Sequence, residues 1–174
     1  MKKTLAAASF SALLAIVASS TSSGFANWNT KYWANEKNFN RISSFNVSDN
    51  LPKGSKSTTK TSSEVVTASE DGKTLMYTDS DLGVVGLVDI SDPAKPKALG
   101  VVELEAEPTG IAALGNNAYI GSNTSESYTN PSGALVQYNL KTRKKIKQCN
   151  VGGQPDSVFV SPDGTFVAVA IENE

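Results

Sequence analysis

One hairpin pattern occurs three times in this sequence and constrains its fold more than any other feature. In each copy a short apolar strand leads through a tight turn into a second apolar strand, and the turns are Asp71-Gly72, Asn116-Asn117 and Asp163-Gly164. Successive turns are 45 and 47 positions apart. Asp, Asn and Gly suit tight hairpin turns, and hairpins spaced by roughly 40–50 residues are typical of propeller blades. The repeat therefore predicts an all-β fold of β-propeller blades, each a four-stranded antiparallel meander.

Two complete blades and the first half of a third fit into residues 64–174. The expected strands are 65–68, 74–78, 84–90 and 97–102 in the first blade, 109–113, 118–121, 134–140 and 145–151 in the second, and 157–160 and 165–171 in the third. Because closed propellers have roughly 4–8 blades, the partial β-propeller is incomplete in this chain. We expect the sequence to be the front part of a longer protein that carries the remaining propeller blades.

The first 26 residues have the pattern of a bacterial signal peptide. Lys2 and Lys3 precede an apolar stretch over residues 5–17, and small residues lead to a cleavage position before Asn27. The apolar stretch is shorter than the roughly 20 residues that span a bilayer, so no membrane anchor is expected to remain. The sequence therefore predicts a periplasmic or secreted protein.

Residues 27–63 differ in kind from the blades that follow. Aromatic residues among Asn and Lys come first, and residues 41–47 then alternate polar and apolar side chains like one half-buried strand. The polar stretch over residues 49–63 indicates a loop. We expect the single strand to complete the last blade of the ring, so that both ends of the chain fasten it.

Charge and cysteine content exclude several classes of partner and bond. Removing Lys2 and Lys3 from 16 basic residues leaves 14 against 17 acidic residues, a net charge of −3. An acidic surface argues against binding nucleic acid or anionic lipid. Cys149 is the single cysteine, so no internal disulfide can form. We expect it to be a small buried residue on a strand, with intermolecular pairing as the alternative.

The chain contains no histidine. This excludes Ser-His-Asp and Cys-His catalysis by the chain itself, and it excludes zinc held by histidine. Carboxylates, hydroxyls, lysine, backbone groups or a metal with oxygen ligands remain as means of catalysis.

The propeller topology is expected to bring several carboxylates to one rim. Loops between the second and third strands and loops between blades open on the same face, and they carry Asp79, Asp81, Glu107, Asp156 and Glu172. Ca²⁺ takes 6–8 oxygen ligands of this kind, and a bound metal could activate water for attack on a phosphoester. The sequence thus gives a candidate Ca²⁺ site. The alternative is that these residues are solvated or cap turns; for Asp156, the strongest candidate, capping Ser157 or Val158 is the competing role.

The same rim is expected to carry one extended loop, over residues 123–132. It contains Asn123, Ser125, Glu126 and Tyr128, with Tyr128 at its tip. Ser125 could act as a nucleophile only with a base, and no histidine is present to serve as one. A long rim loop with an aromatic tip favours binding over hydrolysis.

Several longer strings resemble known exported propellers. Gly86-Leu87-Val88-Asp89-Ile90-Ser91-Asp92-Pro93 resembles the LVIVD-type repeat, and Pro162-Asp163-Gly164 with the apolar strand after it resembles YVTN-type blades. The strings at residues 123–128, 152–158 and 170–174 are similar to proteins described as "esterase-like activity of phytase", some labelled alkaline phosphatase. The likeness extends from about Trp28 to the end of the chain. It implies a large periplasmic or secreted propeller that hydrolyses a phosphoester or ester small-molecule substrate.

Three hypotheses for function remain. The first is a metal-assisted phosphoester hydrolase of the phytase-like kind, of which this chain is the front part. The second is a non-catalytic surface or periplasmic propeller that binds a partner on its rim, since propellers host many unrelated functions. The third is a truncation product without function. The sequence leaves open the substrate, the metal, the number of blades and the catalytic residues.

Overall fold

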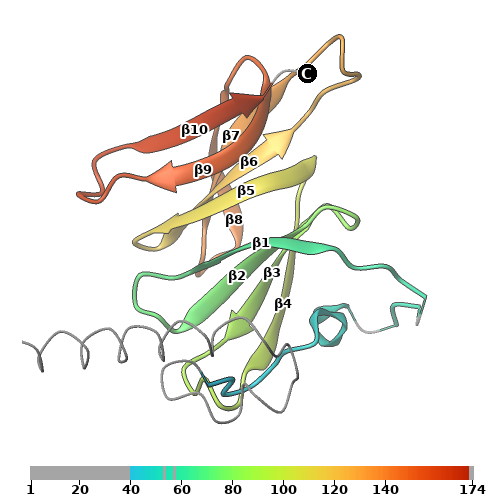
Figure 1. Ribbon diagram of the computed structural model, residues 1–174, viewed down its shortest axis with the longest axis vertical. Helices are drawn as coiled ribbons and strands as arrows, with labels where there is room; N and C mark the ends of the chain where they lie inside the picture. Colours follow the sequence, from blue (N-terminus) through green and yellow to red (C-terminus); the bar gives the residue numbers. More distant parts are fainter. Residues whose placement is uncertain (1–39, 53, 57, 173–174) are drawn as a thin grey trace, which may run out of the picture. The chain divides into compact units, whose positions relative to one another are not determined.

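The computed structural model describes residues 40–52, 54–56 and 58–172 (Figure 1). The predicted signal peptide and the aromatic stretch after it lie outside the described residues. The chain divides into two units, residues 1–42 and residues 43–174. Every element named below belongs to the second unit. In the described part of the chain, no helix is both long enough and apolar enough to cross a bilayer.

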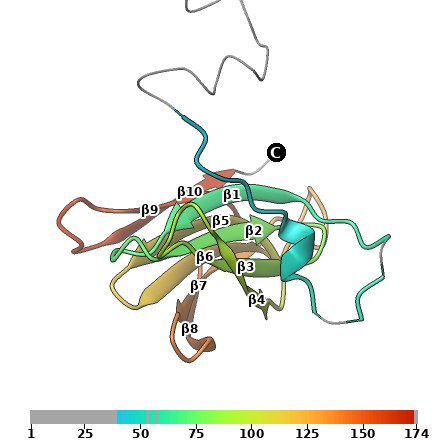
Figure 2. The same ribbon diagram turned by 90° about the horizontal axis from the view of Figure 1, so that it is seen from below.

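The second unit is all-β and consists of antiparallel meanders, as predicted (Figures 1 and 2). Two of its sheets have four strands in sequence order and the third has two. The strands of the first blade are β1 (Ser63–Ala68), β2 (Thr74–Asp79), β3 (Val84–Asp89) and β4 (Lys97–Glu103); those of the second are β5 (Glu107–Leu114), β6 (Asn117–Asn123), β7 (Gly133–Asn139) and β8 (Lys144–Asn150); the third has β9 (Gln154–Val160) and β10 (Val167–Glu172). The prediction of propeller blades is confirmed, and the sheets do not close into a ring.

The tight turns of the first and third blades share one hydrogen-bonded arrangement. The Ser69 hydroxyl donates to Asp71 Oδ1 at 2.6 Å, and the Ser161 hydroxyl donates to Asp163 Oδ1 at the same distance. Each serine oxygen also accepts a backbone N–H from the start of the next strand. The glycines after these aspartates have φ of +66° and +68°, a conformation that glycine adopts without strain. The repeated Ser-x-Asp-Gly sequence therefore sets both hairpins in the same way.

These turns predict a loss of stability in acid. Hydrogen bonds from Ser69 and Ser161 are the main reason that the pKa values of Asp71 and Asp163 are lowered from 3.8. The ionised carboxylates thus stabilise the fold fully above the unfolded-state pKa and lose this contribution as the pH falls through the lower folded-state values. We expect the thermal midpoint, measured by circular dichroism, to fall below about pH 4. In the double variant Asp71→Asn/Asp163→Asn, the thermal midpoint should decrease less as the pH is lowered. In the control variant Asp81→Asn, it should decrease as much as in the wild type. An equal decrease in all three proteins would contradict this account.

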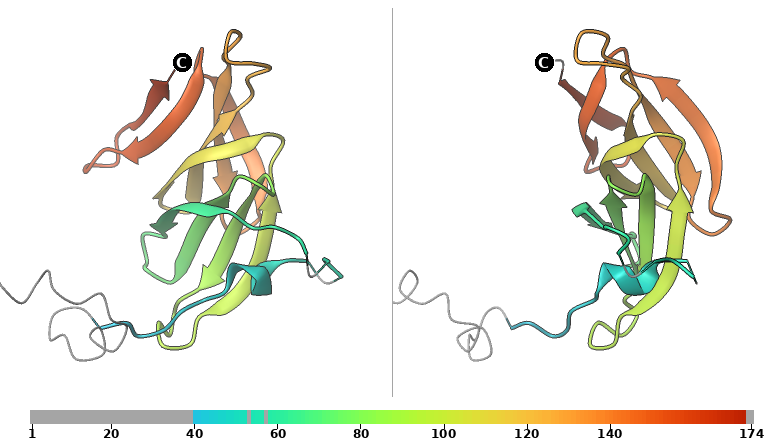
Figure 3. Two further views of the ribbon diagram at one scale, coloured as in Figure 1. Left: turned by 45° about the vertical axis from the view of Figure 1, so that its right-hand side comes forward. Right: turned by 90° about the vertical axis from the view of Figure 1, so that its right-hand side faces the viewer.

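The main hydrophobic core lies between the first and second blades. Met76, Val85 and Leu87 of the first blade pack with Ile111 and Ile120 of the second. Side chains alternate between the two faces of a strand, so Val85 and Leu87 lie on the same face of β3. Met76 pairs with Leu87 across the sheet, and both side chains point to the second blade. β5 contacts β1 and β2 on one side and β9 on the other (Figure 3). The first strands of the three blades therefore lie next to one another, as in a propeller.

The third blade packs on the second where three glycines leave room. A Cβ at Gly110 or Gly121 would come within 3.3 Å of β9 atoms, and one at Gly133 would overlap the Pro155 ring. Pro155 is itself fully buried. The backbones of the two blades can therefore approach more closely than larger residues would permit.

The predicted strand over residues 41–47 is not formed. Residues 41–46 have no strand pairing, and Val47–Asn50 forms a 3-10 turn, η1, after the capping residue Asn46. The burial of the side chains does alternate as the sequence predicts, since Ser43, Phe45 and Val47 are half-buried while their neighbours are exposed. It reflects packing of an extended segment on a sheet face rather than pairing at an edge. The proposed closure of the ring by this segment stays a prediction.

Asn50 fixes η1 to the first blade. It is 2% exposed, and its amide donates to the Leu87 carbonyl and the Tyr77 hydroxyl, both at 3.1 Å. Its Oδ1 accepts the Gly100 N–H at 2.7 Å. The register between β3 and β4 shifts after Leu87, so the Asn50 side chain satisfies backbone groups that this bulge leaves unpaired.

The prediction that Cys149 is buried was wrong. This residue is exposed, as is every residue of β8. β8 is the outer strand of its blade, and only its β7 side pairs with another strand. The lysines of β8 place positive charges along this edge, which disfavours pairing with another chain.

Candidate functional site

The antiparallel topology places one set of loops at a common end of the blades, which we call the rim. The rim comprises residues 80–83, 104–106, 124–132 and 151–153, together with the strand ends that they join. The acidic candidates Asp79, Asp81, Glu107 and Glu172 all lie at this end, as the sequence predicted. None of the four loops contains lysine or arginine. The rim therefore presents mainly negative charge.

Each first strand has a β-bulge at the same distance from the rim. The extra residues are Glu64 and Val65 in β1, Thr109 in β5 and Asp156 in β9, where the register shifts against the second strand. Bulges of this kind redirect side chains and are frequent near binding sites. Sequence reasoning found Asp156 but missed Glu64 and Thr109. Aligning the three repeats on Glu64-Val65, Thr109-Gly110 and Asp156-Ser157 would have found all of them.

Asp79 is buried and serves mainly as a turn cap. Its Oδ1 accepts the N–H groups of Ser62 at 3.0 Å and Leu82 at 3.2 Å, while its Oδ2 has no hydrogen-bond partner among the described residues. Nearby, Glu64 accepts the hydroxyl hydrogens of Ser62 and Ser80. These contacts fix the path of the chain into the first blade.

The other predicted metal ligands are exposed and mostly separate. Asp156 accepts a hydrogen bond from the Ser157 hydroxyl at 3.2 Å, and its role as a cap of the Ser157 or Val158 N–H groups stays a prediction. Glu107 accepts one from the Asn123 amide at 3.3 Å, so these two predicted residues are brought together. In the described part of the chain, no group of three or more His, Cys, Asp or Glu residues is close enough to hold a metal ion. The Ca²⁺ site stays a prediction that no contact supports.

The rim loop over residues 124–132 is held by its own hydrogen bonds. The Thr124 and Ser132 hydroxyls share a hydrogen bond of 2.8 Å, and Ser125 Oγ donates to the Ser132 carbonyl and accepts the Ser132 N–H. Nearer the tip, Ser127 pairs with Asn130 in an isolated bridge. The loop therefore forms a small hairpin beyond β6 and β7, whereas the matching loop of the first blade has four residues, 80–83.

Tyr128 stands at the tip of this loop and is 78% exposed. The Asn130 amide donates to Glu126 at 3.1 Å, which links the two sides of the hairpin below it. The predicted loop residues Asn123, Ser125 and Glu126 are thus used to shape the loop and to hold Tyr128 outward. The Ser125 hydroxyl makes both of its hydrogen bonds to the backbone of Ser132. Neither partner is a base that could activate this hydroxyl as a nucleophile.

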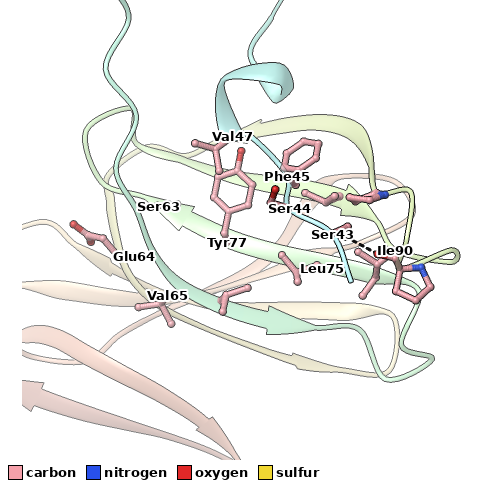
Figure 4. A pocket seen from close by; sticks show the side chains of 14 residues that line it. Ser43, Ser44, Phe45, Val47, Ser63, Glu64, Val65, Leu75, Tyr77 and Ile90 are labelled. Carbon is pink, nitrogen blue, oxygen red and sulfur yellow. Dashed lines mark hydrogen bonds between the residues drawn. The ribbon is translucent and has the colours of Figure 1, made fainter. Parts of the chain in front are cut away.

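An apolar pocket of about 470 Å³ lies on the face of the first blade that points away from the second (Figure 4). Phe45 and Val47 form one wall, and Leu75, Tyr77 and Val88 form another. Burial, the largest cause, raises the pKa of Tyr77, and the Asp79 charge adds to the rise. The Tyr77 phenol therefore stays neutral, and the mostly apolar lining of the pocket suits an apolar group.

The fold is similar to that of a solved structure. The structure resembles one titled "Kuenenia stuttgartiensis Hydrazine Synthase", with a TM-score of 0.53 and 25% identity over 69% of this chain and 32% of that chain. The matched part is less than a third of that chain. Among curated proteins, no sequence matches this chain.

A match to a protein-family model identifies the family of this sequence. The model of the choice-of-anchor I domain matches residues 64–174, which include every strand but the first residue of β1. The resemblance to the phytase-like and alkaline-phosphatase-labelled propellers was therefore wrong as an assignment of family. The chain belongs to the choice-of-anchor I domain family.

Proposed function

We propose that this chain is part of an exported, non-catalytic propeller that binds a partner through the rim loop over residues 124–132. The observation that carries the proposal is the exposed Tyr128 on a loop that is already held by hydrogen bonds. Tyrosine supplies a large contact area with few rotatable bonds. A loop ordered before binding also loses little conformational entropy when the partner arrives.

The electrostatics of the rim support binding of a neutral or basic partner. Glu107, Glu126 and Asp156 lie there, and the loops contain no basic residue. Such a surface repels nucleic acid and anionic lipid, and it draws in positively charged groups. The family name, which refers to anchoring, agrees with export from the cell. A periplasmic or cell-surface location for the partner is part of the proposal.

The hydrolase hypothesis has lost its main support. It rested on a resemblance that the family match replaces, and the carboxylates proposed to hold its metal form no group of three in the described residues. Nothing in the described residues favours it over binding.

Replacing Tyr128 by alanine tests the proposal. We expect the purified protein to bind isolated cell envelopes of the producing bacterium saturably in a sedimentation assay, and Tyr128→Ala to bind at least about tenfold more weakly, as loss of an aromatic anchor does. Tyr128→Phe should keep most of the affinity, because it retains the ring.

Tyr119→Phe is the matched control. It also removes a tyrosine hydroxyl, which in the structure accepts a hydrogen bond from Gln137 away from the loop. This variant should bind like the wild type. Equal binding by Tyr128→Ala and wild type would show that the loop is not the binding surface.

A further inference from the structure

A second, smaller pocket lies on the outer half of the second blade, on the side that faces the first blade. We call it the linker pocket, because residues 104–106, which join the two blades, cross over it. Its volume is about 260 Å³. The walls come from β6, β7 and β8, with Ser122, Val136 and Gln148 in neighbouring register positions. The pocket is therefore built by three strands and a linker.

Unused hydrogen-bonding groups line the linker pocket. Ser122 is 4% exposed, and its hydroxyl makes no hydrogen bond to a described residue, nor does the hydroxyl of Tyr138. Burial, the largest cause, raises the pKa of Tyr138, so this phenol keeps its proton. Gln148 has one contact, from Lys145 to its Oε1 at 3.5 Å, which leaves its amide N–H groups available. The hydroxyls of Ser122 and Tyr138 and the amide of Gln148 are therefore open to a ligand that can exchange hydrogen bonds with them.

An ion pair crosses the mouth of the pocket. Lys145 Nζ lies 2.6 Å from Glu105 Oε1, and these are the two charged residues that line it. The pocket carries one charge of each sign, so its lining has no net charge that would favour an anion or a cation. The apolar part of the lining comes from Leu104, Ala106, Ala134 and Val136, and Thr124 adds one more hydroxyl. The pocket therefore suits a neutral ligand with several hydroxyl groups and one apolar face.

We propose that the linker pocket binds one sugar residue of a neutral glycan. A pyranose ring carries hydroxyls that can pair with Ser122, Tyr138 and Gln148, and its C–H face can lie on the apolar lining. The pocket adjoins the rim, because residues 104–106 and Thr124 line it, but Tyr128 at the tip of the rim loop does not. Side chains alternate along β6, so Ser122, which lines the pocket, and the neighbouring Asn123, which bonds Glu107, point to opposite faces.

Saturation-transfer NMR and calorimetry with the whole chain test this proposal. The probes are the methyl glycosides of glucose, galactose, mannose and N-acetylglucosamine. We expect at least one to bind saturably with a Kd on the order of millimolar, as a single ring in a small pocket allows. Ser122→Ala and Gln148→Leu should each weaken binding about three- to tenfold. Ser122→Ala should leave the thermal midpoint close to that of the wild type, because the Ser122 hydroxyl has no hydrogen bond to a described residue to lose.

Two controls separate this proposal from the rim function. Gln137→Leu alters a glutamine on the neighbouring strand β7 that does not line the pocket, and it should bind sugar like the wild type. Tyr128→Ala should also keep sugar binding, whatever its effect on envelopes. The proposal is overturned if none of the four glycosides saturates, or if Ser122→Ala and Gln148→Leu leave the affinity unchanged.

Discussion

Replacing Asn50 by alanine is expected to lower the free energy of unfolding by about 3 kcal/mol, since each buried group left without a partner costs about 1–3 kcal/mol. Asn50 serves three such groups: the Gly100 N–H, the Leu87 carbonyl and the Tyr77 hydroxyl. Water cannot easily take its place, because the side chain is buried. Chemical denaturation followed by far-UV circular dichroism measures the change.

Asn46→Ala is the matched control for this variant. Asn46 caps η1 from an exposed position, and its Oδ1 accepts the Ser48 N–H at 3.3 Å. Loss of an exposed cap costs about 1 kcal/mol or less. If Asn50→Ala were no more destabilising than Asn46→Ala, Asn50 would not be the residue that joins η1 to the first blade.

Adding one methyl group at Gly133 is expected to destabilise the protein by about 2–3 kcal/mol, within the range for overpacked interiors. A Cβ at this position would overlap the Pro155 ring and press on the Gly153 carbonyl. The variant Gly133→Ala should therefore loosen the third blade from the second. Hydrogen exchange should show β9 and β10 losing protection before the strands of the first blade.

A double-mutant cycle separates this clash from a general effect of the substitution. In a Pro155→Ala background the ring is absent, and Gly133→Ala should cost at least about 1 kcal/mol less than in the wild type. Additive costs would mean that the two residues do not meet. Such a result would contradict the packing of the third blade on the second.

The fold could be predicted from the sequence because its signals are local and repeated. The Ser69-x-Asp71-Gly72 and Ser161-x-Asp163-Gly164 turns set the hairpins by themselves, and the strand limits followed within a few residues. The segment over residues 41–47 was predicted wrongly because alternation shows which side chains are covered, not whether the backbone pairs. Cys149 was predicted wrongly to be buried, because the burial of a blade's outer strand depends on which residues pack against it from outside the blade.

The candidate site could be predicted only in part. Topology alone placed Glu107 and Asn123 at one end of the blades, where they are in contact. Burial and metal coordination depend on side-chain directions, which a strand pattern does not give. For this reason Asp79 was predicted as a candidate metal ligand, whereas in the structure its carboxylate is buried and caps a turn. Aligned repeats place Glu64 and Asp156 at the same position, but the bulges there became visible only with the register.

Binding and turnover measured on one preparation of the intact protein test the central claim most directly. The account predicts saturable binding to cell envelopes that depends on Tyr128, and no hydrolysis of p-nitrophenyl phosphate or p-nitrophenyl acetate above the rate without protein. Hydrolysis that Asp156→Asn abolishes, while envelope binding is absent, would contradict the account and restore a catalytic role for the rim.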